Sequence, residues 1–112
     1  MQRAIRASIS AIIIGLIAAA TGDALADGDA GQGREIADRL CKGCHVVGVD
    51  NRHGGIDSTP SFFLMSDKLD KYRERLWSLK SRPPHTAYER LNDVSIDDIE
   101  HLLAYIGNLE RP

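Results

Sequence analysis

The sequence has no segment in which apolar and polar residues alternate with a period of two, and it has no internal repeat. Because half-buried strands show that alternation, its absence argues against a sheet and predicts an all-α chain. The chain also lacks an excess of positive charge: its formal net charge is −2 at pH 7, which argues against nucleic acid as a partner. Only two of its 112 residues are cysteine and two are methionine, so each of these four needs an explanation.

The longest apolar run lies near the N-terminus. Two arginines precede the run ISAIIIGLIAAA, and the small-x-small sequence ALA follows it at residues 24–26. These features predict a secretory signal peptide over residues 1–26, with cleavage after Ala26 and a mature domain over residues 27–112. The alternative is an uncleaved anchor, but a spanning helix needs about 20 apolar residues, which this run reaches only if polar positions are included.

The mature part has the periodicity of helices joined by loops. We expect helices over residues 30–40, 60–65 and 66–80, a loop over residues 46–59, and a last helix beginning after Ser95. Asp29 is the expected N-cap of the first helix. Ser95 followed by Asp98 is close to a capping box for the last helix.

Apolar residues mark the expected core. In the helix over residues 66–80, Trp77 should widen the buried face, and Pro60 should stand in the first turn of the short helix before it. The last helix should bury one broad face formed by Ile96, Ile99, Leu102, Leu103, Ile106 and Leu109.

The two cysteines belong to the stretch CKGCH, residues 41–45. A disulfide between Cys41 and Cys44 would close a very small loop and stabilise little through chain entropy. Zinc needs four ligands, usually a second cysteine pair or two spaced histidines, and neither is present. A dithiol redox site is expected within a βαβ pattern, which an all-α chain does not have.

Covalent haem attachment accounts for every residue of the stretch. Cys41 and Cys44 can each add to one vinyl group of a porphyrin, and His45 then supplies a nitrogen to the iron. The sequence therefore predicts one haem c, bound covalently through Cys41, Cys44 and His45.

The mature chain resembles the class I cytochromes c of the small bacterial periplasmic, single-haem type. The likeness runs from GDAGQGREIADRLCKGCH through PSF and a Leu-Trp helix to VSIDDIEHLLAYIGNL. It implies a cytochrome c-like fold, in which the N- and C-terminal helices cross around one haem. Gly33 and Tyr105 match the small and aromatic positions of that crossing. It also implies thioether bonds at Cys41 and Cys44, with His45 as the proximal iron ligand.

The second axial ligand departs from that family. The family usually supplies a methionine from the loop before the last helix, whereas this loop reads RPPHTAYERLNDVS. His85 is a candidate distal ligand, Met65 is the alternative, and Tyr88 stands at the methionine position in one register of the loop. An iron without a protein ligand on this side is the remaining possibility. His53 and His101 are expected to face solvent.

The resemblance implies a periplasmic electron carrier, not an enzyme, that exchanges electrons with transient redox protein partners. We expect the mature protein to have no stable membrane anchor once the signal peptide is removed. Alternatives are a haem-bearing subunit of a periplasmic oxidoreductase, a five-coordinate haem sensor or peroxidase-like protein, and an exported binding module without haem. A basic cluster is a possible docking patch, or else a solvated face of mixed charge: Lys68, Lys71, Arg73, Arg75, Lys80 and Arg82.

Overall fold

The computed structural model describes residues 28–110, and the expected signal peptide, residues 1–26, lies outside that range. Within it the chain forms α-helices and short 3-10 or π segments but no strand, which confirms the expected all-α class for this part. The four α-helices are α1 (Ala30–Ile36), α2 (Phe62–Asp67), α3 (Leu69–Trp77) and α4 (Ile96–Gly107). None of the helices in the described part is long and apolar enough to cross a bilayer.

The first helix begins where the sequence predicted. The Asp29 side chain accepts a hydrogen bond from the amide of Gln32 at 2.9 Å, so Asp29 is the N-cap of α1. The helix then widens into a π-helical turn, η1 (Ala37–Cys41), closed by a 3.0 Å bond from the Lys42 amide to the Ala37 carbonyl oxygen. Such turns are often found at functional sites, and this one ends on the first cysteine of the motif.

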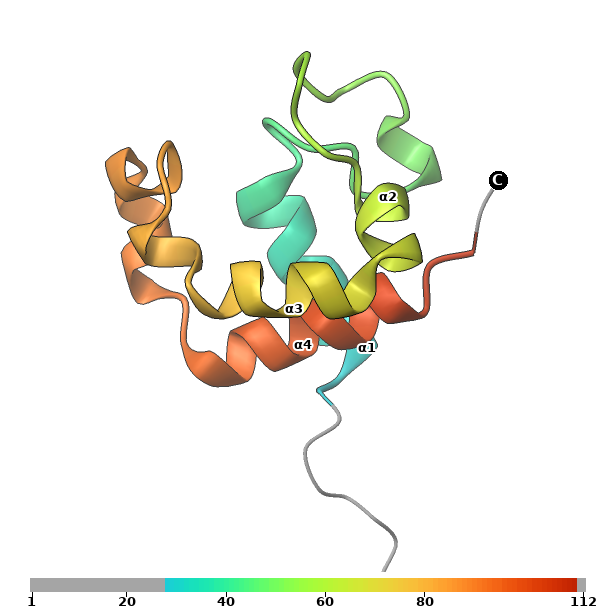
Figure 1. Ribbon diagram of the computed structural model, residues 1–112. Coiled ribbons are helices and arrows are strands. Elements are labelled where there is room, and N and C mark those ends of the chain that lie inside the picture. The colour runs from blue at the N-terminus through green and yellow to red at the C-terminus, as the bar shows by residue number, and fades with distance from the viewer. Residues whose placement is uncertain (1–27, 111–112) are drawn as a thin grey trace, which may run out of the picture.

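Helices α1 and α4 pack across each other (Figure 1). At the contact, a Cβ on Gly33 would lie 2.6 Å from the carbonyl carbon of His101 and 2.7 Å from the Cβ of Tyr105. Only glycine lets the two backbones approach this closely. The expected packing of the N-terminal helix against the C-terminal helix, with Gly33 and Tyr105 at the contact, is therefore confirmed.

The core lies where α1, α2 and α3 meet α4. Its buried side chains are Ile36, Ala37, Val47, Phe62, Met65, Tyr72, Leu76, Leu91, Val94, Ile99, Leu102, Leu103 and Ile106. Leu102 and Ile106 are the largest fully buried residues among those described, one turn apart on α4. The apolar face of α4 is thus the surface on which the other helices pack.

The capping box of α4 is confirmed. The Ser95 side chain accepts from the Asp98 amide at 3.1 Å, and the Asp98 carboxylate accepts from the Ser95 amide at 2.9 Å. These two bonds satisfy donors that a helix start leaves unpaired.

Three sequence expectations are wrong in detail. Trp77 is 49% exposed because it is the last residue of α3 and points away from the face that buries Tyr72 and Leu76. Ile96 is 62% exposed because it is the first residue of α4, beyond the edge of the core. Pro60 precedes α2, whose N-cap is Ser61.

The helix expected over residues 66–80 is interrupted. Lys68 has φ −127° and ψ 41°, outside helical geometry, so α2 ends and α3 begins on either side of it. The chain after α3 forms three 3-10 segments: η3 (Leu79–Ser81), η4 (His85–Ala87) and η5 (Glu89–Asp93).

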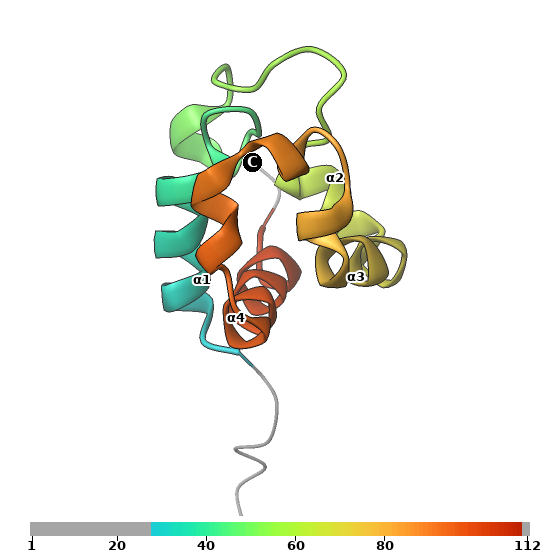
Figure 2. The ribbon, with the colours of Figure 1, turned by 90° about the vertical axis from the view of Figure 1, so that its left-hand side faces the viewer.

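The segment that carries η3 to η5 rises from the layer of α3 and α4. In Figures 1 and 2 it stands on the same side of that layer as the C-terminal end of α1 and the loop that follows it. Leu91 and Val94 bury their side chains in the core and anchor the segment. This arrangement places His85, on η4, on the same side of the molecule as the CKGCH motif.

Candidate functional site

The CKGCH motif forms one turn at the end of η1. The amides of Cys44 and His45 both donate to the Cys41 carbonyl oxygen, at 3.1 and 2.9 Å. Cys41 is half-buried against the core, and Cys44 is exposed. Both cysteines are free, without a disulfide between them, so both thiols remain available for reaction.

The Cys41 thiol is a weak acid in this fold. Burial raises the pKa of the Cys41 thiol to about 12, and the neighbouring Cys44 raises it further toward that value. At neutral pH Cys41 is therefore a protonated thiol with little spontaneous nucleophilic reactivity.

One hydrogen bond fixes the ring of His45. Its Nδ1 lies 2.6 Å from the Pro60 carbonyl oxygen. A carbonyl oxygen can only accept, so Nδ1 carries the proton and the lone pair of the neutral ring is on Nε2. A metal-binding histidine typically donates its second N–H to such a carbonyl. The contact therefore prepares His45 for ligation through Nε2.

Asn51 organises the loop that follows the motif. Its Oδ1 accepts from the amides of Val47 and Gly48 at 2.8 and 3.1 Å, and its Nδ2 donates to the His45 carbonyl oxygen at 3.0 Å. The amide of Phe62 closes the loop by donating to the Val46 carbonyl oxygen at 2.8 Å. Sequence analysis missed this role, although asparagine is typical of loops whose backbone it can bond.

Tyr105 ties the same loop to α4. Its hydroxyl donates to the Val47 carbonyl oxygen at 2.6 Å, and its ring lies 6.3 Å from that of Phe62. Burial raises the pKa of the Tyr105 hydroxyl, which keeps the proton needed for this bond. The backbone just after His45 is therefore held from both α2 and α4.

His85 lies opposite His45. The ring centroids are 6.3 Å apart and the ring planes differ by 12°. The Nδ1 of His85 is buried and has no hydrogen-bond partner among the described residues. Burial lowers the pKa of His85, the electrostatic effect of the neighbouring His45 lowers it further, and the backbone of Arg82 acts in the opposite direction.

The other two candidate distal residues have different surroundings. Met65 lies on α2 and is 6% exposed, with its side chain in the core cluster. Tyr88, between η4 and η5, is 43% exposed. Of the three candidates, His85 is the one whose ring pairs with the ring of His45.

The remaining two histidines lie elsewhere. His53 is exposed in the loop after the motif, as expected. His101 is half-buried on α4, and its Nδ1 accepts a hydrogen bond from the Asp29 amide at 2.8 Å. The expectation of a solvent-facing His101 was therefore wrong, because the start of α1 packs against that side of α4.

Direct binding of a metal by protein ligands alone finds no support in the described part of the chain. Within residues 28–110, no three His, Cys, Asp or Glu side chains are grouped closely enough to share an ion. A zinc site built on the motif would need such a group.

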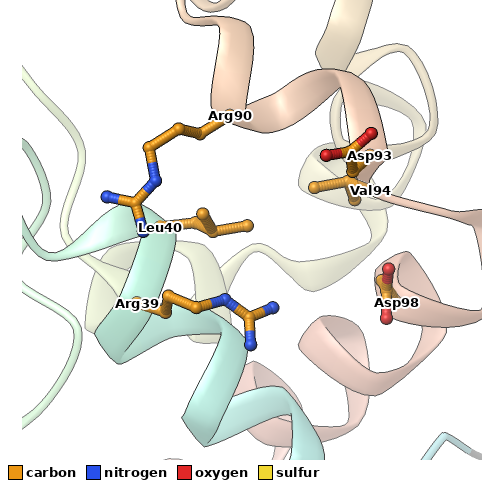
Figure 3. Close-up of a pocket in the computed structure, with 6 residues that line it drawn as sticks. All are labelled: Arg39, Leu40, Arg90, Asp93, Val94 and Asp98. Carbon is orange, nitrogen blue, oxygen red and sulfur yellow. The ribbon is translucent and has the colours of Figure 1, made fainter.

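A separate cavity of about 290 Å³ lies between η1, η5 and the start of α4 (Figure 3). Leu40 and Val94 contribute its apolar lining. Its charged lining residues are Arg39, Arg90, Asp93 and Asp98. Figure 3 shows both arginines on one side and both aspartates on the other. None of the lining residues belongs to the CKGCH motif.

Comparison with known proteins found no matching family model, curated protein or solved structure. The case for a haem therefore rests on the chain itself. The free thiols and the free nitrogen of His45 are the groups that a covalent haem would use, and the unpartnered nitrogen of His85 lies across from them. The residues present fit that group.

Proposed function

We propose that the chain is a single-haem c-type cytochrome of the class I type, exported to the bacterial periplasm, that carries single electrons between redox partners. The observation that carries the proposal is the CKGCH turn, with two free thiols and a histidine already oriented by a backbone carbonyl. The packing of α1 against α4 at Gly33 supports it, because this class is built on that helix pair.

In this proposal Cys41 and Cys44 would hold one haem through thioether bonds, and His45 would bind its iron. The haem supplies a site that gains one electron from a reduced partner and loses it to an oxidised one. The Pro60 carbonyl keeps the proton of His45 on Nδ1 and the ring in a fixed orientation. Asn51 and Tyr105 hold the adjoining backbone, so the ligand would move little when the charge of the site changes.

The partner in this proposal is a protein with an acidic surface, docked transiently on the basic face of α3 and η3. That face has six exposed lysine and arginine side chains: Lys68, Lys71, Arg73, Arg75, Lys80 and Arg82. The exposed Trp77 lies in the same stretch, and aromatic and arginine side chains are enriched at docking surfaces. Charge would then steer the encounter.

The experiment is expression in a bacterial host with the machinery for haem attachment in its periplasm. We expect a pyridine haemochrome spectrum of the c type and haem that stays on the chain in a denaturing gel. Cys41→Ala and Cys44→Ala should each lose one thioether bond, and the double variant should lose covalent haem. Lys42→Ala, inside the same motif, is the matched control and should keep both bonds. Wild-type protein without covalent haem would refute the proposal.

A further inference from the structure

We infer that His85 binds the haem iron on the face opposite His45, so that the iron has two histidine ligands. This inference rests on the proposed function, since it concerns the same haem. His85 would then take the place of the methionine that usually binds the iron in the class I family.

The first observation is the separation of the two rings. A metal–imidazole bond is about 2 Å long and the ring centre lies about 1.1 Å beyond the nitrogen, so two imidazoles on opposite sides of one ion have centroids about 6.2 Å apart. The centroids of His45 and His85 are 6.3 Å apart. The observed separation therefore equals the one that two imidazole ligands of a single ion would have.

The second observation is the unsatisfied ring nitrogen of His85. Buried polar atoms are normally hydrogen-bonded, yet the buried Nδ1 of His85 has no partner within residues 28–110. The ring of His45, by contrast, uses Nδ1 to bond Pro60 and keeps Nε2 free. Each ring thus has a nitrogen for which no hydrogen bond is found within residues 28–110.

The third observation concerns the competitors. Met65 is buried on α2 among the core side chains, and no contact between it and the ring of His45 is found within residues 28–110. Tyr88 is close to His85 in sequence but is 43% exposed, with no ring contact to His45. Neither residue faces the ring of His45 as His85 does.

The fold holds η4 in place from both sides. Before it, η3 packs against η4, and Lys80 donates through Nζ to the Asn92 carbonyl oxygen at 3.0 Å. After it, Leu91 and Val94 are buried in the core. The position of His85 is therefore set by packing of the whole segment and not by its own side chain.

The first test needs only wild-type protein with haem attached. Its ferric form should be low-spin, without the weak far-red band that a methionine sulfur gives. Because the ring planes differ by only 12°, we expect the rhombic electron paramagnetic resonance spectrum of two parallel imidazoles. The ferrous form should bind carbon monoxide slowly or not at all. A far-red methionine band, or rapid and complete binding of carbon monoxide, would overturn the inference.

The second test uses variants at the three candidates. His85→Ala should turn the ferric iron high-spin and admit carbon monoxide, and added imidazole should restore the low-spin spectrum. His85→Met should stay low-spin with a raised reduction potential, since thioether ligation favours the reduced iron. Met65→Leu and Tyr88→Phe are the controls and should leave the spectrum unchanged.

The outcomes separate this inference from the proposed function. Covalent haem with an unchanged low-spin spectrum in His85→Ala would refute His85 as ligand and leave the cytochrome assignment intact. Absence of covalent haem in the wild type would refute the proposed function itself. If His85→Ala does not mature, the wild-type spectra still decide the question.

Discussion

At the scale of single residues, the site depends on side chains that bond to backbone. Pro60 orients His45 through a carbonyl oxygen, and Asn51 satisfies two amides and one carbonyl of the loop after the motif. Neither residue has a reactive side chain. Their contribution is to fix the donors that could bind a cofactor, as the residues around a metal ligand commonly do.

The two cysteines should react differently in the chain without haem. Burial raises the pKa of Cys41 to about 12, and a raised thiol pKa means less of the reactive thiolate at neutral pH. Cys44 is exposed. We expect iodoacetamide to modify Cys44 first, with Cys41 slower by about a hundredfold or more. Mass spectrometry of the time course, made on chain produced without haem attachment, measures both rates.

Single-cysteine variants provide the control for that measurement. Cys41→Ser should leave only a fast thiol and Cys44→Ser only a slow one. Raising the pH should accelerate the slow thiol over a wider range than the fast one. Equal rates at neutral pH in the two variants would contradict the burial argument.

At the scale of elements, the fold depends on the contact between α1 and α4, where the two backbones lie close together at Gly33. A Cβ at Gly33 would lie 2.7 Å from the Tyr105 Cβ and 2.6 Å from a backbone carbon of His101, so a helix must shift to admit it. Gly33→Ala should lower the free energy of unfolding by about 1–3 kcal/mol through overpacking, although alanine is the better helix former. Urea unfolding followed by circular dichroism measures the change.

Gly107→Ala is the matched control for that substitution. Gly107 is the last residue of α4, is exposed, and a Cβ there would meet only the end of the Leu69 side chain at 3.3 Å. We expect it to be neutral or to stabilise by up to about 1 kcal/mol, since alanine restricts the unfolded chain. If both variants lose the same stability, close approach at Gly33 is not the cause.

At the scale of the whole molecule, charge is unevenly distributed. The net charge is −2, yet α3 and η3 are rich in exposed cations while the start of α4 is acidic. Because η3 packs against η4, the basic face continues toward His85. A small anion approaching the site would therefore meet local attraction, in spite of the overall negative charge.

The salt dependence of electron transfer tests this distribution. We expect the rate constant for oxidation of the reduced protein by hexacyanoferrate(III) to fall severalfold as ionic strength rises, because salt screens attraction. Lys71→Glu should weaken that dependence, and Arg52→Glu, the same charge change in the loop after the motif, should do so less. A rate that rises with salt would show that the net charge governs the encounter and not the basic face.

The local signals were readable from the sequence because each depends on residues close together in the chain. The N-cap at Asp29 and the capping box at Ser95 are confirmed, and so is the apolar stripe of α4 from Ile99 to Ile106. Two of the errors in predicted burial fall at helix ends. Trp77 and Ile96 satisfied the helical period but lie where α3 ends and α4 begins, beyond the surface that the core covers.

For the candidate site too, one part could be predicted from the sequence and another part depended on the tertiary structure. The spacing within CKGCH determined the expectation of haem, since thiols and histidine at that spacing are a local property of the chain. The sequence left four possibilities for the opposite side of the iron. Only the tertiary structure brought His85 within 6.3 Å of His45, Tyr105 onto the Val47 carbonyl and Met65 into the core. Such contacts join residues far apart in the chain, and they depend on how whole helices pack and not on any local pattern.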